Sequence, residues 1–222
     1  MKLVSILSLA EAAVKGILLK MPRPEFRQER SRRSYEALID AAMELFGKLG
    51  YDAVGTPEIA DKAGVSVGTF YRYFDDKHEV YLEIMRRSIG EAYSVTVERL
   101  TPEHFAKRSR HETITEACRL LFEHVLERPA LTRSFMEMSL RYNDVAELRR
   151  SFEQLAVAKL ATLIGVITPR TTVPDPEAFA YVLYGAAMQC AYGMAVHLVP
   201  SAIDRKRTQE ALAAFIERAL FP

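Results

Sequence analysis

The sequence is poor in the residues from which metal sites are built. It contains only two cysteines, Cys118 and Cys190, which lie far apart in apolar stretches and form no CxxC pair. Its five histidines are scattered, and no HExxH or similar spacing occurs. Because metal sites need clustered ligands at short spacings, the sequence predicts neither a metal site nor a cofactor. We expect both thiols to be buried and reduced, as in a cytoplasmic protein.

Signatures of catalysis and of membrane insertion are also missing. The chain has no Gly-rich phosphate loop, no nucleophile elbow and no alternating strand pattern. An enzyme on a helical scaffold would need a nucleophile, a paired acid and base or a metal set, so we predict that this chain is not an enzyme. Its first twenty residues are apolar but contain Glu11 and Lys15, so we expect no membrane span.

Net charge is low, but its distribution is uneven. The formal charge of +1 would not by itself indicate a nucleic-acid partner. Residues 20–34, however, hold six bases against two acids, whereas residues 35–80 hold four bases against nine acids. The positive charge is therefore concentrated in an arm that precedes a negatively charged region.

Residues 56–77 have the pattern of two short helices joined by a tight turn. Thr56 can cap the first helix, Pro57 suits its first position, and Gly64 can end it in the left-handed region. Ser66 then caps a second helix over residues 67–74. This spacing is typical of a helix-turn-helix, which presents its second helix to a partner.

The second helix of this pair has two faces. Phe70 and Phe74 lie four residues apart and are expected to point inward. The side chains left for a partner are Val67, Gly68, Thr69, Tyr71, Arg72 and Tyr73. In the alternative interpretation, the tyrosines are packing residues of an ordinary helical hairpin.

The rest of the chain is predicted to be helical. A long helix with an apolar stripe ends at Gly50, and a fourth helix, capped by Asp76, ties the head to a larger body. The body is expected to contain helices over 111–127, 131–142, 143–167, 177–199 and 204–220. We therefore predict an all-α fold with an N-terminal extension, a head and a body, over residues 1–21, 22–80 and 81–222.

The head resembles a known family. The stretches YEALIDAAMELFGKLGYDAVGTPEIA and AGVSVGTFYRYFDDKHEVYLEIM are similar to the N-terminal domain of TetR-family bacterial transcriptional regulators over residues 34–85. This resemblance implies a homodimeric, ligand-responsive repressor that binds a pseudo-palindromic operator in double-stranded DNA. A small, largely apolar effector would release it. The rival interpretations are a dimeric helical interaction module without DNA binding and, from another class, an enzyme.

The resemblance also implies a set of DNA contacts. Phosphate contacts would come from Ser66, Tyr71, Tyr73 and Lys77, with Thr56 donating from the first short helix. Val67, Gly68 and Thr69 would approach base edges, because they begin the recognition helix. Arg72 would reach a guanine or a phosphate, and Arg32 and Arg33 in the arm would follow the backbone or enter the minor groove. The family often has histidine where Tyr73 stands.

The helix over 177–199 is apolar on more than one side, so it must be covered on more than one side. With the last helix it could form half of a four-helix dimer interface, as the resemblance implies. The residues predicted to lie there are Gly185, Ala187, Ala191 and Met194. In the alternative interpretation, this is a core helix of a monomer.

A ligand cavity in the body is a further expectation. The residues predicted to line it are Phe122, Phe135, Met138, Tyr142, Phe152, Tyr181, Tyr184 and Gln189. Residues of these types are more often plain core residues, which is the alternative interpretation of each. Residues 1–20 have two interpretations: Met21 opens a stretch that looks like a natural start for the family, or the preceding residues form an extra amphipathic helix.

Overall fold

A computed structural model describes residues 28–196 and 203–222. Within these ranges the chain is all-helical and contains no strand. The head consists of α2 (Glu29–Leu49), α3 (Thr56–Lys62) and α4 (Val67–Phe70), and α5 (Lys77–Val95) leads out of it. The body contains α6 (Pro102–Lys107), α7 (Arg110–Glu127), α8 (Pro129–Arg141), α9 (Asn143–Ile167), α10 (Pro176–Ala195) and α11 (Arg205–Leu220). None of the described helices is long and apolar enough to cross a membrane.

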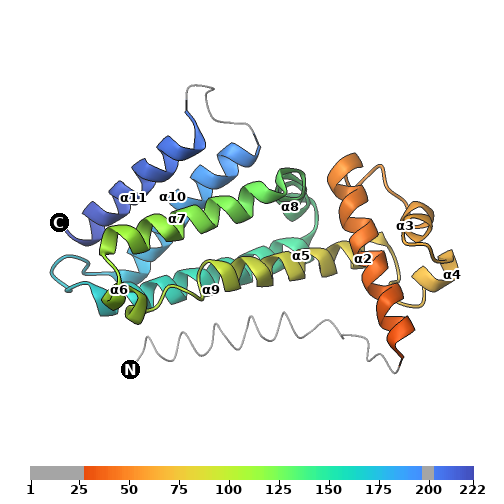
Figure 1. Ribbon diagram of the computed structural model, residues 1–222, viewed down its shortest axis with the longest axis horizontal. Helices are drawn as coiled ribbons and strands as arrows, with labels where there is room; N and C mark the ends of the chain where they lie inside the picture. The colour runs from red at the N-terminus through yellow and green to blue at the C-terminus, as the bar shows by residue number, and fades with distance from the viewer. Residues whose placement is uncertain (1–27, 197–202) are drawn as a thin grey trace.

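The helices form an elongated molecule with the head at one end (Figure 1). Helices α5 and α9 run along its length beside each other, while α7, α10 and α11 pack together over the far part of the body. Helix α8 contacts α2, so the body touches the head through a second element besides α5. The all-α architecture predicted from the sequence is confirmed.

Side-chain caps fix the starts of α7, α10 and α11 in the body. The Asp175 carboxylate accepts hydrogen bonds of 3.1 Å from the amides of Glu177 and Ala178, as its position before Pro176 suggests. Asp204 caps α11 in the same way. Helix α8 begins at Pro129, two residues earlier than predicted. Proline has no amide hydrogen, but the amides of a first helical turn have no partner within the helix, so proline is well tolerated there.

The hydrophobic core is divided between the two ends of the molecule. The head core joins α2, α3, α4 and the first half of α5, with Phe46, Ile59 and Phe70 almost completely buried. Helices α8 and α9 contribute Met138 and Val145 to the same core. A second core joins α7, α9, α10 and α11. The inward orientation predicted for Phe70 and Phe74 is confirmed.

Two boundaries in the head differ from the prediction. Helix α3 begins at Thr56 itself, and Gly55 is its N-cap: the Gly55 amide donates 3.1 Å to the Glu58 carboxylate. A Cβ on Gly55 would lie 2.6 Å from that oxygen, so glycine allows the close approach. The regular part of α4 ends at Phe70, and the chain continues as a turn in which the Phe74 amide donates 3.1 Å to the Phe70 carbonyl.

The described part of the basic arm is helical. We expected Arg30, Arg32 and Arg33 in a segment leading into the first long helix, but they lie in the first turns of α2, which begins at Glu29. The reason is that Glu29 favours the positive end of a helix and pairs with arginines one turn later. The remainder of the arm and the N-terminal extension lie outside the described residues.

Candidate functional site

The short helix α4 is held at a fixed angle on the head. Gly64 adopts a φ of +67°, which lets the chain turn sharply after α3. Ser66 caps α4 through a hydrogen bond of 3.2 Å from the Thr69 amide, and the two hydroxyl groups lie 3.0 Å apart. Phe70 anchors the helix in the head core. The turn, the cap and the anchor together present the opposite face of α4.

The presented face carries both apolar and polar groups. Val67 is 40% exposed and Tyr71 is 54% exposed, and Gly68 lies between them on the surface. The Tyr71 hydroxyl lies 3.1 Å from the Thr56 hydroxyl at the start of α3. Because either group can donate, this pair leaves one further hydrogen bond available to a partner.

The two remaining candidates on this segment lie in different environments. Arg72 is exposed, and within the described ranges it makes no ion pair or hydrogen bond. Tyr73 is half-buried, and its ring meets the ring of Tyr35 edge to face at 5.7 Å between centroids. Tyr35 in turn stacks on Phe74 at 5.1 Å. Arg72 is therefore available for contact, whereas Tyr73 also serves the packing of α4 on α2.

Lys77 has a structural role that the sequence did not reveal. Its ammonium donates hydrogen bonds to the carbonyls of Tyr51 at 2.9 Å and Val54 at 2.8 Å. It also lies 4.6 Å from the centre of the Tyr51 ring. Lys77 thus fastens the loop between α2 and α3 to the start of α5. Its phosphate contact stays a prediction, and that contact would compete with these carbonyls.

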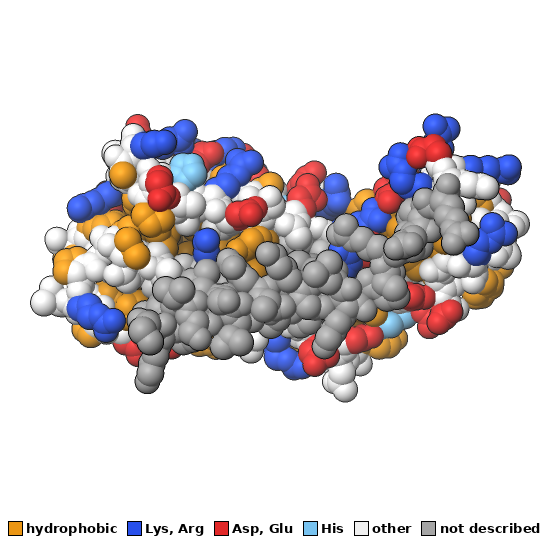
Figure 2. All heavy atoms as spheres, turned by 90° about the horizontal axis from the view of Figure 1, so that it is seen from below, with side chains coloured by type: hydrophobic (Ala, Val, Ile, Leu, Met, Phe, Trp, Pro, Cys, Tyr) orange, Lys and Arg blue, Asp and Glu red, His pale blue; other side chains and the backbone are white. Residues whose placement is uncertain are grey.

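Charged groups on the head are largely paired with one another. Figure 2 shows acidic and basic side chains interspersed over this end of the molecule. Arg32 forms a bidentate pair with Glu29, at 2.7 and 3.0 Å, and Arg33 contacts the same carboxylate. Hydrogen bonds from Lys48 and Lys62 lower the pKa of Glu44 to about 2. The bases of the head are therefore partly neutralised before any partner arrives.

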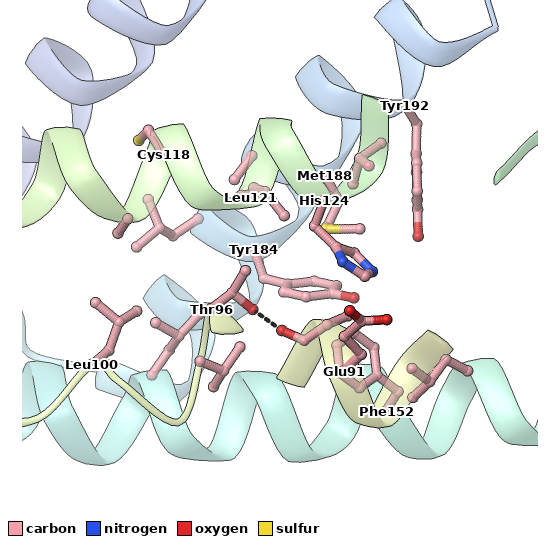
Figure 3. Close-up of a pocket in the computed structure, with 18 of the residues that line it drawn as sticks. Glu91, Thr96, Leu100, Cys118, Leu121, His124, Phe152, Tyr184, Met188 and Tyr192 are labelled. Carbon is pink, nitrogen blue, oxygen red and sulfur yellow. Dashed lines mark hydrogen bonds between the residues drawn. The ribbon is translucent and has the colours of Figure 1, made fainter. Parts of the chain in front are cut away.

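The body contains a mainly apolar cavity of about 210 Å³ (Figure 3). Its walls come from α5, α7, α9 and α10, with α8 and α11 closing parts of it. Of the residues predicted to line a ligand cavity, the structure brings together Phe135, Phe152 and Tyr184. The other five do not line it.

These five residues lie at separate places. Phe122 and Met138 are buried in the two cores. Tyr142 packs on His78 at 4.5 Å, at the boundary between head and body. Tyr181 and Gln189 are exposed on α10. Sequence periodicity separates apolar faces from polar ones, but it does not say which apolar face borders a cavity.

Among the polar residues of the cavity wall that the sequence analysis missed are Glu91 on α5, His124 on α7 and Tyr192 on α10. Burial lowers the pKa of His124 below its ordinary value, against the influence of nearby Glu91. A signal for His124 existed, since it follows Leu121 by three residues on the apolar face of α7. Nothing comparable marked Glu91. Within the described ranges no group of three or more Cys, His, Asp and Glu side chains could hold a metal ion.

The predicted dimer residues also have different environments. Gly185 is exposed, and among the described residues no side chain or neighbouring helix comes within 4 Å of the position where its Cβ would be. Ala187 lines the cavity, Ala191 is fully buried in the body core, and Met194 packs against that core. Of the four, only Gly185 faces outward in the single chain.

Comparison with known proteins gives a match to the head and similarity over most of the chain. The family model for bacterial regulatory proteins of the tetR family matches residues 38–84. The fatty acid metabolism regulator protein of Bacillus subtilis is 27% identical over 141 residues, covering 63% of this chain and 69% of that protein. The transcriptional repressor KstR of Mycobacterium tuberculosis is 38% identical over 66 residues, covering 30% of each chain.

Solved structures share the fold over most of the chain. A candidate TetR-family regulator from Mesorhizobium loti has a TM-score of 0.67 at 23% identity, covering 87% of this chain and 98% of that one. The fatty acid degradation regulator FadR of Bacillus halodurans has a TM-score of 0.59 at 16% identity, covering 89% and 96%. These similar proteins are transcriptional regulators and not enzymes. Residues 38–84 therefore form a helix-turn-helix DNA-binding domain of the tetR family of bacterial regulatory proteins, and the chain is similar over most of its length to transcriptional regulators of that family.

Proposed function

We propose that the protein is a homodimeric repressor that binds a pseudo-palindromic operator and leaves it when a small, largely apolar effector fills the cavity in the body. The observation that carries this proposal is the position of α5. Its first half, including Val80 and Tyr81, belongs to the head core, and its second half, including Glu91 and Ala92, lines the cavity. A ligand in the cavity therefore touches the helix on which the head is mounted.

The head and the body are joined by further polar contacts that can transmit a shift of α5. Arg87 on α5 pairs with Glu36 on α2 at 2.5 Å. At the corner between α8 and α9, Arg141 pairs with Asp52 at 2.8 Å, and Asp144 lies 2.8 Å from the His78 ring. A displacement of α5 would change the orientation of the head, so that two heads no longer fit grooves about 34 Å apart.

For the DNA contacts we retain the predicted residues and divide them into three groups: base contacts, phosphate contacts and one positioning residue. Val67, Gly68 and Thr69 would approach base edges, because they open the presented helix α4. Phosphate contacts would come from Thr56, Ser66, Tyr71, Arg72 and Tyr73, with Arg32 and Arg33 at the start of α2. Lys77 would act mainly by holding the loop that positions α3.

The dimer would form through the outer faces of α10 and α11. Tyr181 is 61% exposed and Val182 is 63% exposed on α10, and Phe215 is 52% exposed on α11. Exposed Gly185 lies one turn beyond Tyr181 and would allow a close approach of a partner helix. Large apolar side chains gathered on neighbouring helices are typical of a surface that a partner covers.

The names of similar proteins guide the choice of effector. Two of them regulate fatty acid metabolism or degradation by name. An alkyl or acyl chain would suit the apolar lining of the cavity, whose volume lies somewhat below the roughly 300–1,000 Å³ of drug-sized sites. We therefore propose an effector with an apolar chain of moderate length.

The experiment begins with selection of genomic fragments on the immobilised protein, followed by footprinting. We expect two half-sites related by a two-fold axis, and operator release when alkyl or acyl compounds are added. The matched pair Val182→Glu and Glu210→Gln tests the dimer by sedimentation, since Glu210 is an exposed charge on α11. Dissociation only in Val182→Glu supports the interface. A single half-site, or a monomer that binds as well as the native chain, would refute the proposal.

A further inference from the structure

One end of the cavity in the body is polar. In Figure 3 the Glu91 carboxylate, the His124 imidazole and the Tyr184 hydroxyl point toward one another from α5, α7 and α10. The Tyr192 hydroxyl lies beside them, and Phe152 on α9 borders the group. Elsewhere the lining is mainly aliphatic and aromatic. A molecule in the cavity therefore meets a mainly apolar wall and, at one end, a cluster of polar groups.

Within the described part of the chain, these polar groups have no hydrogen-bond or ion-pair partners. Glu91, His124 and Tyr184 form neither kind of contact. Other polar side chains of the wall are satisfied: the Thr132 hydroxyl donates 2.9 Å to the Val125 carbonyl, and Thr96 donates to the Ala92 carbonyl. His124 and Tyr184 are half-buried, where polar groups are normally paired, whereas Glu91 is also exposed to solvent. The three groups are left for a ligand or for water.

The charge of the cluster limits the ligand it would accept. Burial lowers the pKa of His124 and raises that of Tyr184, so both side chains are neutral near pH 7. Glu91 supplies the carboxyl group of the cluster. Arg128 at the cavity edge lies 3.8 Å from the Glu127 carboxylate, so its charge is already matched. Arg149 and Glu153 act on Tyr184 and Tyr192 with opposite charges, so the acidic group that is left at the polar end is Glu91.

We propose that this cluster binds the head group of the effector and selects one that is cationic or donates hydrogen bonds, such as a primary amine on an alkyl chain. This inference rests on the proposed effector site. An ammonium group could donate to Glu91 and to the free nitrogen of neutral His124, and lie near the rings of Tyr184 and Tyr192. A carboxylate would instead bring a second negative charge beside Glu91.

Titration calorimetry with three ligands of equal chain length, decylamine, decanol and decanoate, tests this selection at pH 7.5. We expect decylamine to bind about tenfold or more tightly than decanoate, with decanol between them, because hydrogen bonds to charged groups are the stronger ones. Glu91→Gln should remove most of the preference for the amine and leave decanol binding within about threefold. The control Glu98→Gln changes an exposed carboxylate outside the cavity wall and should behave as the native chain.

The possible outcomes separate this inference from the proposed function. Tighter binding of decanoate, an unchanged preference in folded Glu91→Gln, or no binding of any of the three ligands overturns the inference. If decanoate is preferred and still releases the operator, the proposed function stands without it. If decylamine is preferred in the expected way but leaves the operator complex intact, the inference stands and the proposed release mechanism fails.

Discussion

The head and the body differ in how their inward polar groups are used. In the head, the Lys77 ammonium binds three loop carbonyls, and the Tyr81 hydroxyl meets Ser134 at 3.1 Å. In the body, Glu91, His124 and Tyr184 converge on a cavity without partners in the described chain. These polar groups of the head thus have partners within the single chain, while the body has an unfilled apolar cavity and polar groups that can still form hydrogen bonds.

This difference indicates a division of roles. A helix that reads DNA needs a fixed position, which the head supplies by packing Phe70 and Phe74 under α4. A site for a small molecule needs space, and the cavity supplies it at a cost in stability. Helix α5 belongs to both regions, so it is the element through which one would influence the other.

The largest expected effect compares one core residue from each region. Phe70→Ala should lower the free energy of unfolding by about 3–5 kcal/mol, because Phe70 is fully buried in a packed core. Leu121→Ala should cost about 1–2 kcal/mol, because that side chain borders the cavity and already lacks neighbours on one side. Urea denaturation followed by circular dichroism measures both. Equal losses would mean that the cavity wall is packed as tightly as the head.

A second comparison separates positioning from contact within the head. Lys77→Met keeps the aliphatic stem but removes the ammonium that donates to three loop carbonyls, so we expect a loss of about 1–3 kcal/mol in unfolding free energy. Arg72→Met should leave stability nearly unchanged and weaken operator binding, because Arg72 is exposed and unpaired in the described chain. Thermal melts and binding titrations distinguish the two. The assignment fails if Arg72→Met melts early and Lys77→Met does not.

The arginines at the start of α2 should have a smaller effect, on salt dependence. Replacing Arg30, Arg32 and Arg33 by Gln should reduce the slope of log affinity against log salt by about two, because each phosphate contact contributes roughly 0.9. Sequence preference should stay, since base edges are read by α4. Arg119→Gln on α7 serves as the control, being a paired arginine of the body. An unchanged slope in the triple variant would show that Glu29 already neutralises these residues.

The smallest expected effect concerns pH. Burial holds the pKa of His124 below its ordinary 6.5, while Glu91 and Glu127 oppose that shift and Arg128 supports it. As pH falls below about 6.5, His124 is protonated more readily in the unfolded chain than in the folded chain, so the free energy of unfolding decreases. His124→Gln should flatten this dependence between pH 7 and 5.5, measured by urea denaturation. A slope identical to that of the native chain would remove His124 as its source.

How much could be foreseen from the sequence depended on how local each feature is. The helix-turn-helix followed from Pro57, Gly64 and Ser66, since each acts within its own turn. The helix over 143–167 was predicted with its end at Ile167 for the same reason. Only Phe135, Phe152 and Tyr184 of the predicted cavity set line the cavity, because its lining is fixed by how α5, α7, α9 and α10 pack together.

The sequence by itself determined most of the helices, the caps Ser66 and Asp76, and the face that α4 presents, because these follow from side chains a few residues apart. Tertiary structure decided the rest. The Lys77 ammonium donates to carbonyls of the α2–α3 loop, and Ala191 is buried in the core. Glu91, His124 and Tyr184 come together from three helices. Contacts between residues far apart in the sequence depend on the angles at which helices cross. Those angles are set by packing over the whole fold and not by local sequence.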